Sequence, residues 1–120
     1  MFTSIAIMQL RDKGELSLND PIKKHLPWFN IENTYPEKGD VTIKGILTHS
    51  SGLPRESNHP YWTGPDFIFP SSENIQNKLG KQKTLYPANR YFQYSNLGPF
   101  IGRRNYHCYL WDGFRHIYQT

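Results

Sequence analysis

The sequence has almost no cysteine and no long apolar run. Cys108 is the only cysteine among the 120 residues, which excludes an internal disulfide. No apolar stretch approaches the roughly 20 residues of a membrane-spanning helix, so we expect no transmembrane segment. The five histidines show no metal-ligand spacing with Cys108 or with one another, so we expect no metal and no cofactor.

Acidic residues are in the minority, but the excess of basic residues is small. Fourteen Lys and Arg against ten Asp and Glu give a net charge of +4. Apart from Arg103, Arg104 and Arg115, the positive charges are scattered, which is typical of a solvated surface. We therefore expect no nucleic-acid partner. A basic leader with a cleavage site is also missing at the start, so no signal peptide is predicted and the localisation stays unknown.

Apolar residues recur at helical spacing in two segments near the start. Residues 2–13 predict a helix that ends at Gly14, although no capping residue precedes it. Asp20 and Pro21 predict the N-cap and first residue of a short helix that ends at Pro27.

Three more helices are predicted along the chain. Thr42 is the expected N-cap of one that ends at Gly52, and its buried face is Ile43, Ile46 and Leu47. Ser71 or Ser72 caps the next, and the last begins at Ser95 or Asn96. Residues 54–71 hold four prolines and predict an irregular loop. We therefore expect a mainly α chain with long loops, and this loop is long enough to predict an incomplete fold.

Three phrases stand in order along the chain: "FTSIAIMQLRDKGELSLNDPIKKHLPWF", "VTIKGILTHSSGLP" and "YFQYSNLG". Together they resemble the serine beta-lactamase-like family, which includes class C beta-lactamases, D-alanyl-D-alanine carboxypeptidases and related esterases. The resemblance covers roughly residues 1–101 and implies a fragment of an α+β fold: the helical region without the central antiparallel sheet. Residues 1–102 would then be a partial beta-lactamase-related domain.

The resemblance also implies roles for the Tyr-x-Asn motif. Family members transfer acyl groups through a serine and a lysine spaced as Ser-x-x-Lys. Tyr94 would be the proton-relay group beside them, and Asn96 would donate its amide to the substrate carbonyl. Ser95 would be a spacer whose hydroxyl caps the following helix. The implied substrate is a small molecule, peptide or ester, and the family is usually exported.

The sequence departs from the family pattern at its nucleophile. No serine in the chain has a lysine three residues later, and Lys83-Thr84-Leu85 is not the family's late Lys-Thr-Gly motif. In the family this motif runs directly into a phrase like "MFTSIAIMQL", so the resemblance implies that the missing Ser-x-x-Lys would stand just before Met1, which would also explain the uncapped start of the first helix. We expect a serine-hydrolase fragment that is inactive alone. The alternative is a stand-alone, non-catalytic binding or interaction module on a degenerated scaffold.

The resemblance stops after Gly102, and residues 103–120 show no clear periodicity. With suitable synonymous codons, the next reading frame of this segment encodes an amphipathic helix, a Gly-Met turn and a second helix start. We therefore interpret the tail as out-of-frame translation. A genuine, divergent aromatic tail is the alternative.

Several side chains allow a structural interpretation beside the functional one. Tyr94 could be a core ring, and Tyr91 and Phe92 are interpreted as packing residues. The His49-Ser50-Ser51-Gly52 run is interpreted as a helix end, because adjacent helical residues point apart and no carboxylate orients the histidine. Three aromatic residues could line a cleft, with core packing preferred: Trp28, Trp62 and Phe67.

Overall fold

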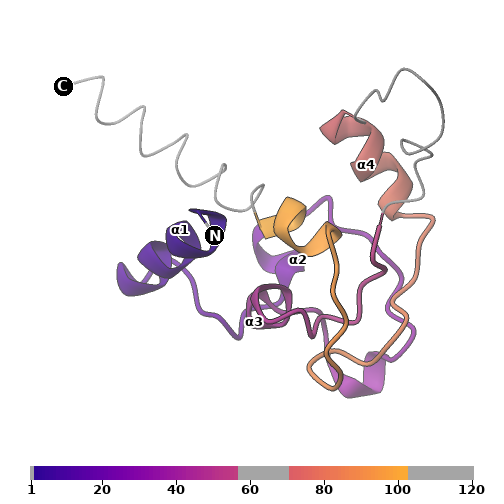
Figure 1. The fold of residues 1–120 in the computed structure, drawn as a ribbon, viewed down its shortest axis with the longest axis horizontal. Helices are drawn as coiled ribbons and strands as arrows, with labels where there is room; N and C mark the ends of the chain where they lie inside the picture. Colours follow the sequence, from indigo (N-terminus) through magenta and orange to yellow (C-terminus); the bar gives the residue numbers. More distant parts are fainter. Residues whose placement is uncertain (1, 57–70, 103–120) are drawn as a thin grey trace.

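The computed structural model describes residues 2–56 and 71–102 (Figure 1). Its elements are α1 (Phe2–Asp12), α2 (Ile22–His25), the 3-10 helix η1 (Pro36–Lys38), α3 (Ile43–Leu47) and α4 (Ser72–Leu79). Residues 97–102 are also helical. Within these ranges there is no strand, only isolated bridges between Pro21 and Thr42 and between Glu32 and Lys83. The predicted mainly α chain with long loops is confirmed. Trp62, Phe67, most of the 54–71 loop and the 103–120 tail lie outside the described residues.

Helix α1 ends as its sequence predicts. Gly14 has a φ of 74°, a left-handed conformation that glycine adopts without a Cβ clash. Its N–H donates to the Arg11 carbonyl at 2.9 Å, and the Glu15 N–H donates to the Leu10 carbonyl at 3.0 Å. This pair of bonds is the Schellman motif, which satisfies carbonyl groups that the helix leaves free.

The predicted cap of α2 is wrong. Pro21, not Asp20, is the N-cap residue, and it makes no side-chain capping bond. The first helical N–H, that of Ile22, donates instead to the Val41 carbonyl at 2.9 Å. A backbone bond from a distant segment thus replaces the side-chain cap and frees the Asp20 carboxylate for other partners. The helix ends at His25, before Pro27, as predicted.

Helix α3 begins as predicted and ends earlier. The Thr42 hydroxyl accepts from the Gly45 N–H at 3.1 Å, and Ile43 and Ile46 are buried while Leu47 is partly buried. The helix ends at Leu47, because His49 turns into the left-handed region with a φ of 53°. Gly52 is therefore not the helix stop.

Of the two remaining predicted caps, one is confirmed and the other is wrong. Ser71 is the N-cap of α4, and its hydroxyl accepts from the Asn74 N–H at 3.2 Å. The last helical stretch begins directly after Asn96. The Ser95 hydroxyl does not cap that helix as predicted, because it donates to the Pro54 carbonyl at 2.7 Å.

The core lies where the helices meet around α3. Figure 1 shows α2 and α3 between α1 and α4, with the 97–102 helix above them. Buried apolar residues from every one of these elements pack in one cluster, which includes Ile7, Leu10, Ile22, Leu26, Ile43, Ile46, Leu53, Leu79, Leu97 and Ile101. Trp28 packs against this cluster, as the preferred interpretation expects. Within the described ranges, no helix is long and apolar enough to cross a membrane.

Candidate active site

Two of the motif-bearing segments lie side by side. Residues 49–55 carry the end of "LTHSSGLP", and residues 85–96 lead into Tyr-Ser-Asn. Five backbone bonds join them, each written donor first: Leu85 to Gly52 at 2.8 Å, Tyr86 to Gly52 at 3.4 Å, Asn89 to Ser50 at 2.7 Å, Gln93 to His49 at 2.7 Å and Asn96 to Arg55 at 2.8 Å. The predicted motifs, far apart in the sequence, therefore form one continuous surface.

Gly52 allows the two segments to approach this closely. Its φ is 78°, and a Cβ built on it would lie 2.0 Å from the Tyr86 carbonyl oxygen. The Cβ of any other residue would clash with this backbone carbonyl, which cannot move aside as a side chain can. The residue would also be strained in the left-handed region. The glycine of "HSSGLP" thus positions the segment that carries the Tyr-x-Asn motif.

Tyr94 lies at the surface of this site and not in the core. Tyr94 is 47% exposed, so the alternative in which its ring lies in the core is wrong. Its ring stacks on the imidazole of His49 with 4.5 Å between centroids and 26° between planes. The Arg55 guanidinium carbon lies 5.8 Å from the Tyr94 ring centroid, in cation–π range. Tyr94 is therefore held mainly by the stacking of its ring on His49.

Asn96 is exposed, and among the described residues its side-chain amide has one partner. Its Nδ2 donates to a carboxylate oxygen of Glu56. Glu56 also lies 3.9 Å from Arg55 as an ion pair. Since an amide nitrogen carries two hydrogens, Asn96 keeps a second donor for a ligand.

Ser95 is the buried spacer between these two residues. It is 1% exposed, and its hydroxyl and amide are both used internally, by Pro54 and by Nδ1 of His49. Because these bonds fix its backbone, the neighbouring side chains of Tyr94 and Asn96 extend outward on a rigid support. The spacer role is consistent with this position, whereas the helix-capping role is wrong.

Sequence reasoning gave no site role to three residues that lie here: His49, Arg55 and Glu56. The interpretation of His49 as part of a helix end is confirmed, because its N–H donates to the Ile46 carbonyl at 3.3 Å and its left-handed backbone follows α3 directly. Its contacts with Tyr94 and Ser95 come from distant sequence and have no local signal. Arg55 and Glu56 follow the "GLP" turn directly, and this adjacency to a recognised motif is the one signal that could have pointed to them.

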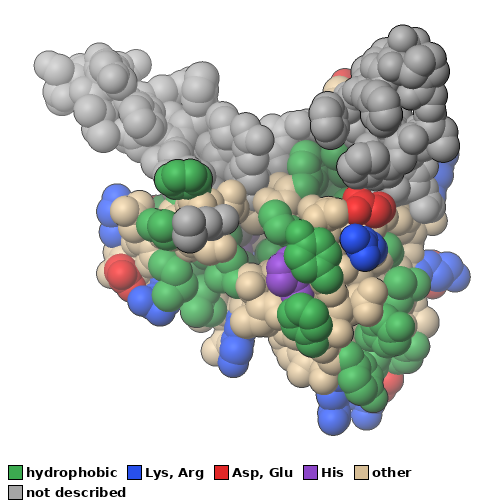
Figure 2. Space-filling model, viewed as in Figure 1, with side chains coloured by type: hydrophobic (Ala, Val, Ile, Leu, Met, Phe, Trp, Pro, Cys, Tyr) green, Lys and Arg blue, Asp and Glu red, His purple; other side chains and the backbone are tan. Residues whose placement is uncertain are grey.

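Tyr91 and Phe92 do not pack in the core, so the packing interpretation is wrong. They are 60% and 74% exposed. With the other exposed apolar residues of residues 85–94, they form an aromatic face beside the site: Leu85, Tyr86, Tyr91, Phe92 and Tyr94. Figure 2 shows hydrophobic side chains gathered around a histidine on this side of the molecule.

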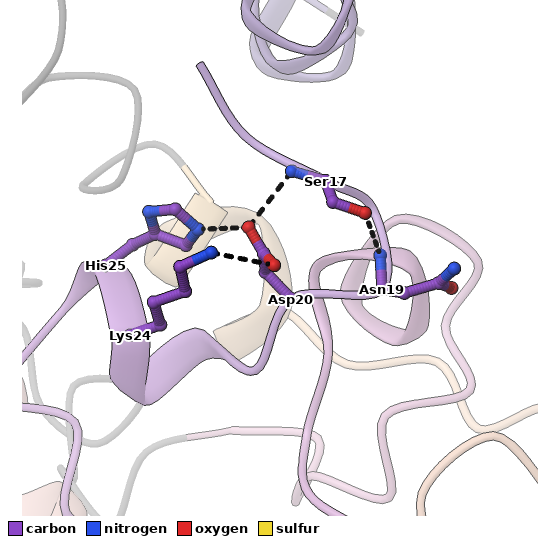
Figure 3. Close-up of polar contacts among 5 residues, drawn as sticks. All are labelled: Ser17, Asn19, Asp20, Lys24 and His25. Carbon is purple, nitrogen blue, oxygen red and sulfur yellow. Dashed lines mark hydrogen bonds and ion pairs between the residues drawn. The ribbon is translucent and has the colours of Figure 1, made fainter. Parts of the chain in front are cut away.

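A separate cluster contains a serine, an aspartate and a histidine, and it stabilises the fold. The Asp20 carboxylate accepts from the Ser17 N–H at 3.0 Å and lies 2.8 Å from Nε2 of His25 and 3.1 Å from Nζ of Lys24 (Figure 3). The Ser17 hydroxyl accepts from the Asn19 N–H at 3.3 Å, away from the histidine, so it is not activated as a nucleophile.

These partners set the charge of Asp20. The Ser17 N–H bond, followed by those from His25 and Lys24, lowers the pKa of Asp20 from 3.8 to about 2. The carboxylate thus joins the turn before α2 to the end of that helix. In the described ranges, no group of three His, Cys, Asp or Glu residues is arranged to hold a metal ion.

Comparisons with known proteins agree with the motifs. The chain is 39% identical over 104 residues to Beta-lactamase-like protein 2 of Dictyostelium discoideum, covering 85% of this chain and 19% of that protein. It is 32% identical over 97 residues to the D-alanyl-D-alanine-carboxypeptidase/endopeptidase AmpH of Escherichia coli (strain K12), covering 81% of this chain and 25% of that protein.

Solved structures give the same result. The beta-lactamase/D-alanine carboxypeptidase of Yersinia pestis superposes with a TM-score of 0.74 at 30% identity, over 88% of this chain and 30% of that one. The hydrolase EstCE1, which has promiscuous acyltransferase activity, shares the fold with a TM-score of 0.63 at 21% identity. The chain thus spans between a fifth and a third of the length of these proteins. A family model described as Beta-lactamase matches residues 1–99, and the chain belongs to the beta-lactamase family.

Proposed function

We propose that this chain is part of a serine hydrolase of the beta-lactamase family, and that it supplies the tyrosine and asparagine of an acyl-transfer site. Tyr94 is the proton-relay group and Asn96 the contact to the substrate carbonyl. The substrate is a small molecule, peptide or ester with a carbonyl that a serine can attack. The chain spans only part of its relatives' length. We therefore assign this activity to a more complete form of the fold and not to the chain alone.

One observation carries the proposal. Tyr94 and Asn96 are both exposed on a support that buries Ser95 between them, beside the "HSSGLP" segment. A motif kept for packing would bury its ring and satisfy its amide internally. Here Tyr94 is about half exposed, and within residues 2–56 and 71–102 Glu56 accepts only one of the two hydrogens of the Asn96 amide. Both groups are available to a ligand.

The proposed chemistry needs a serine and a lysine that these 120 residues do not contain in the required spacing. The serine oxygen attacks the substrate carbonyl and forms an acyl-enzyme, while its proton passes toward the leaving group. Tyr94 would relay that proton, and Asn96 would orient the carbonyl. Without a Ser-x-x-Lys, the isolated chain has no nucleophile to acylate, and we propose that it is inactive alone.

A chimera tests the proposal. Residues 2–102 replace the aligned segment of the Yersinia pestis beta-lactamase/D-alanine carboxypeptidase, and hydrolysis of a chromogenic beta-lactam and of a D-alanyl-D-alanine peptide is measured. We expect turnover that falls at least about 100-fold in Tyr94→Phe, the scale of a lost proton-transfer group. Tyr91→Phe, an exposed tyrosine of the same segment, is the matched control and should retain activity. If Tyr94→Phe leaves the turnover of a folded chimera unchanged, the assigned role of Tyr94 is refuted.

A further inference from the structure

His49 is held in a backbone conformation that non-glycine residues seldom adopt. Its φ is 53°, and in the described ranges only Asn89 shares a positive φ without being glycine. Asparagine tolerates this region well, whereas histidine does so less often. This conformation ends α3, because the His49 N–H donates to the Ile46 carbonyl at 3.3 Å and the Ser50 N–H donates to the Gly45 carbonyl at 2.8 Å, the Schellman pattern. The helix end accounts for the His49 N–H and leaves its carbonyl and ring for other contacts.

The His49 carbonyl and ring both contact the segment that carries the Tyr-x-Asn motif. The His49 carbonyl accepts from the Gln93 N–H at 2.7 Å, and its Nδ1 accepts from the Ser95 N–H at 3.3 Å. Its ring stacks on Tyr94 at 4.5 Å and meets the edge of Phe92 at 6.0 Å. One residue thus holds both the backbone and the ring of the motif.

We propose that His49 is a positioning residue for Tyr94, acting in its neutral form with the ring proton on Nε2. This inference rests on the proposed function only for its catalytic consequence. The ring is the platform that fixes the tilt of the phenol, and the Nδ1 lone pair fixes the backbone of Ser95. Together they set where the Tyr94 hydroxyl lies.

The protonation state follows from the hydrogen bond. A ring nitrogen accepts an N–H only when it carries no proton, so a doubly protonated imidazole loses this bond. The buried Ser95 N–H would then face a second donor, which is unfavourable. Of the residues that the structure describes, Tyr94 is the titratable group in contact with the ring; Arg55 lies over the Tyr94 ring, and Glu56 is paired with Arg55.

Two substitutions separate the two contacts. His49→Asn keeps an acceptor oxygen close to the position of Nδ1 and tolerates the left-handed backbone, but it removes the ring. His49→Phe keeps a ring to stack on Tyr94 and removes the acceptor. Both are made in the full 120-residue chain, and circular dichroism checks that each variant keeps the helical content of the parent.

Nuclear magnetic resonance gives the readout. In His49→Asn the Ser95 amide shift should stay near its parent value, while the Tyr94 ring protons lose their ring-current shift. In His49→Phe the Ser95 amide shift should change, while the Tyr94 ring protons should keep a ring-current shift. In the parent chain, the Ser95 amide should titrate with the same midpoint as the His49 ring, and in His49→Asn that titration should disappear.

Two results would overturn the inference. One is a folded His49→Asn chain in which the Ser95 amide still titrates with the parent midpoint. The other is a parent chain whose Ser95 amide does not follow the His49 ring, and this measurement needs no variant to fold. Both are independent of catalysis, so they separate a failure here from a failure of the proposed function.

The catalytic consequence is measured in the chimera described above. His49→Asn should lower kcat about tenfold or more with KM nearly unchanged, because a misplaced group slows the chemical step more than it weakens binding. A residue with only a structural role would lower the yield of folded enzyme and leave kcat per active site unchanged. That second outcome would contradict the catalytic part of the inference.

Discussion

The N–H of Ser95 donates to Nδ1 of His49 across 46 residues of sequence, at 3.3 Å. This bond joins the "LTHSSGLP" phrase to the Tyr-Ser-Asn phrase at the point where the proposed relay tyrosine is held. The two phrases identify the family from sequence, and their physical connection explains why they occur together: one is the support on which the other is displayed.

Gly52→Ala should destabilise the chain severely. Its φ of 78° disfavours any Cβ, and that Cβ would lie 2.0 Å from the Tyr86 carbonyl oxygen. The two costs together are about 2–5 kcal/mol in the free energy of unfolding. Urea denaturation followed by circular dichroism measures the loss.

Gly14→Ala is the matched control for Gly52→Ala. Gly14 has a similar φ of 74°, but a Cβ there meets no atom within 4 Å. Only the left-handed backbone is penalised, so the expected loss is about 1–2 kcal/mol. Equal losses in the two variants would show that the contact with Tyr86 does not limit the site.

Asp20→Asn should destabilise the chain in a pH-dependent way. The folded-state pKa of Asp20 is about 2, below its ordinary value of 3.8, because Ser17, His25 and Lys24 stabilise the carboxylate. A lowered pKa means that the carboxylate contributes stability above about pH 4, and that this contribution is lost as the pH falls toward 2. The difference between parent and variant should therefore be largest near neutral pH and disappear by about pH 2.

Urea denaturation at several pH values measures this difference, with Asp12→Asn as the control. Within the part of the chain that the structure describes, Asp12 pairs only with the adjacent Arg11 on the surface, so its replacement should change the urea midpoint little at any pH. A loss in Asp20→Asn that stays constant down to pH 2 would contradict the assigned role of the carboxylate.

Thr42→Ala should shorten or fray α3. The Thr42 hydroxyl accepts from the Gly45 N–H and lies 3.3 Å from Oδ1 of Asn89, which belongs to the segment that carries the motif. We expect a loss of about 1 kcal/mol in the free energy of unfolding, the usual cost of removing such a cap. Thr42→Ser keeps the hydroxyl and should recover most of the loss. If serine and alanine behave alike, the cap contributes nothing here.

Thermal unfolding of the whole chain distinguishes part of a hydrolase from a stand-alone binding module. Phe2 is 86% and Ile5 52% exposed on α1, and the aromatic face adds further apolar surface to solvent. A chain that leaves this much apolar surface exposed should unfold broadly and at low temperature, and should bind a hydrophobic dye when folded. A sharp transition at an ordinary domain temperature would favour the module.

The sequence predicted those elements whose signals are local. Gly14, Thr42 and Ser71 end or begin their helices as expected, because a left-handed glycine or a capping hydroxyl acts on neighbouring backbone. The sequence-based prediction failed where a distant segment provides the hydrogen-bond partner instead of the neighbouring backbone. The Ile22 N–H bonds to Val41 and displaces Asp20 as a cap, and the Ser95 hydroxyl bonds to Pro54 and not to its own helix.

For the candidate site, the sequence supplies a hypothesis for some residues and a wrong expectation for others. The roles of Tyr94 and Asn96 rest on the motif and stay a proposal, while Tyr91 and Phe92 were interpreted as packing residues and are exposed. Their exposure depends on what packs beside them, which local sequence does not contain. His49, Arg55 and Glu56 reach the motif through tertiary contacts, so the adjacency of Arg55 and Glu56 to the "GLP" turn is the one sequence signal that points to any of them.

Acylation of the isolated chain is the most direct test of whether it holds an acyl-transfer motif without its nucleophile. The purified 120-residue chain is incubated with a fluorescent penicillin and with a p-nitrophenyl ester, and the intact mass is measured, followed by peptide mapping. We expect no stoichiometric acyl adduct on any serine and no turnover above buffer. A covalent adduct on a serine, lost when that serine is replaced by alanine, would contradict the proposal.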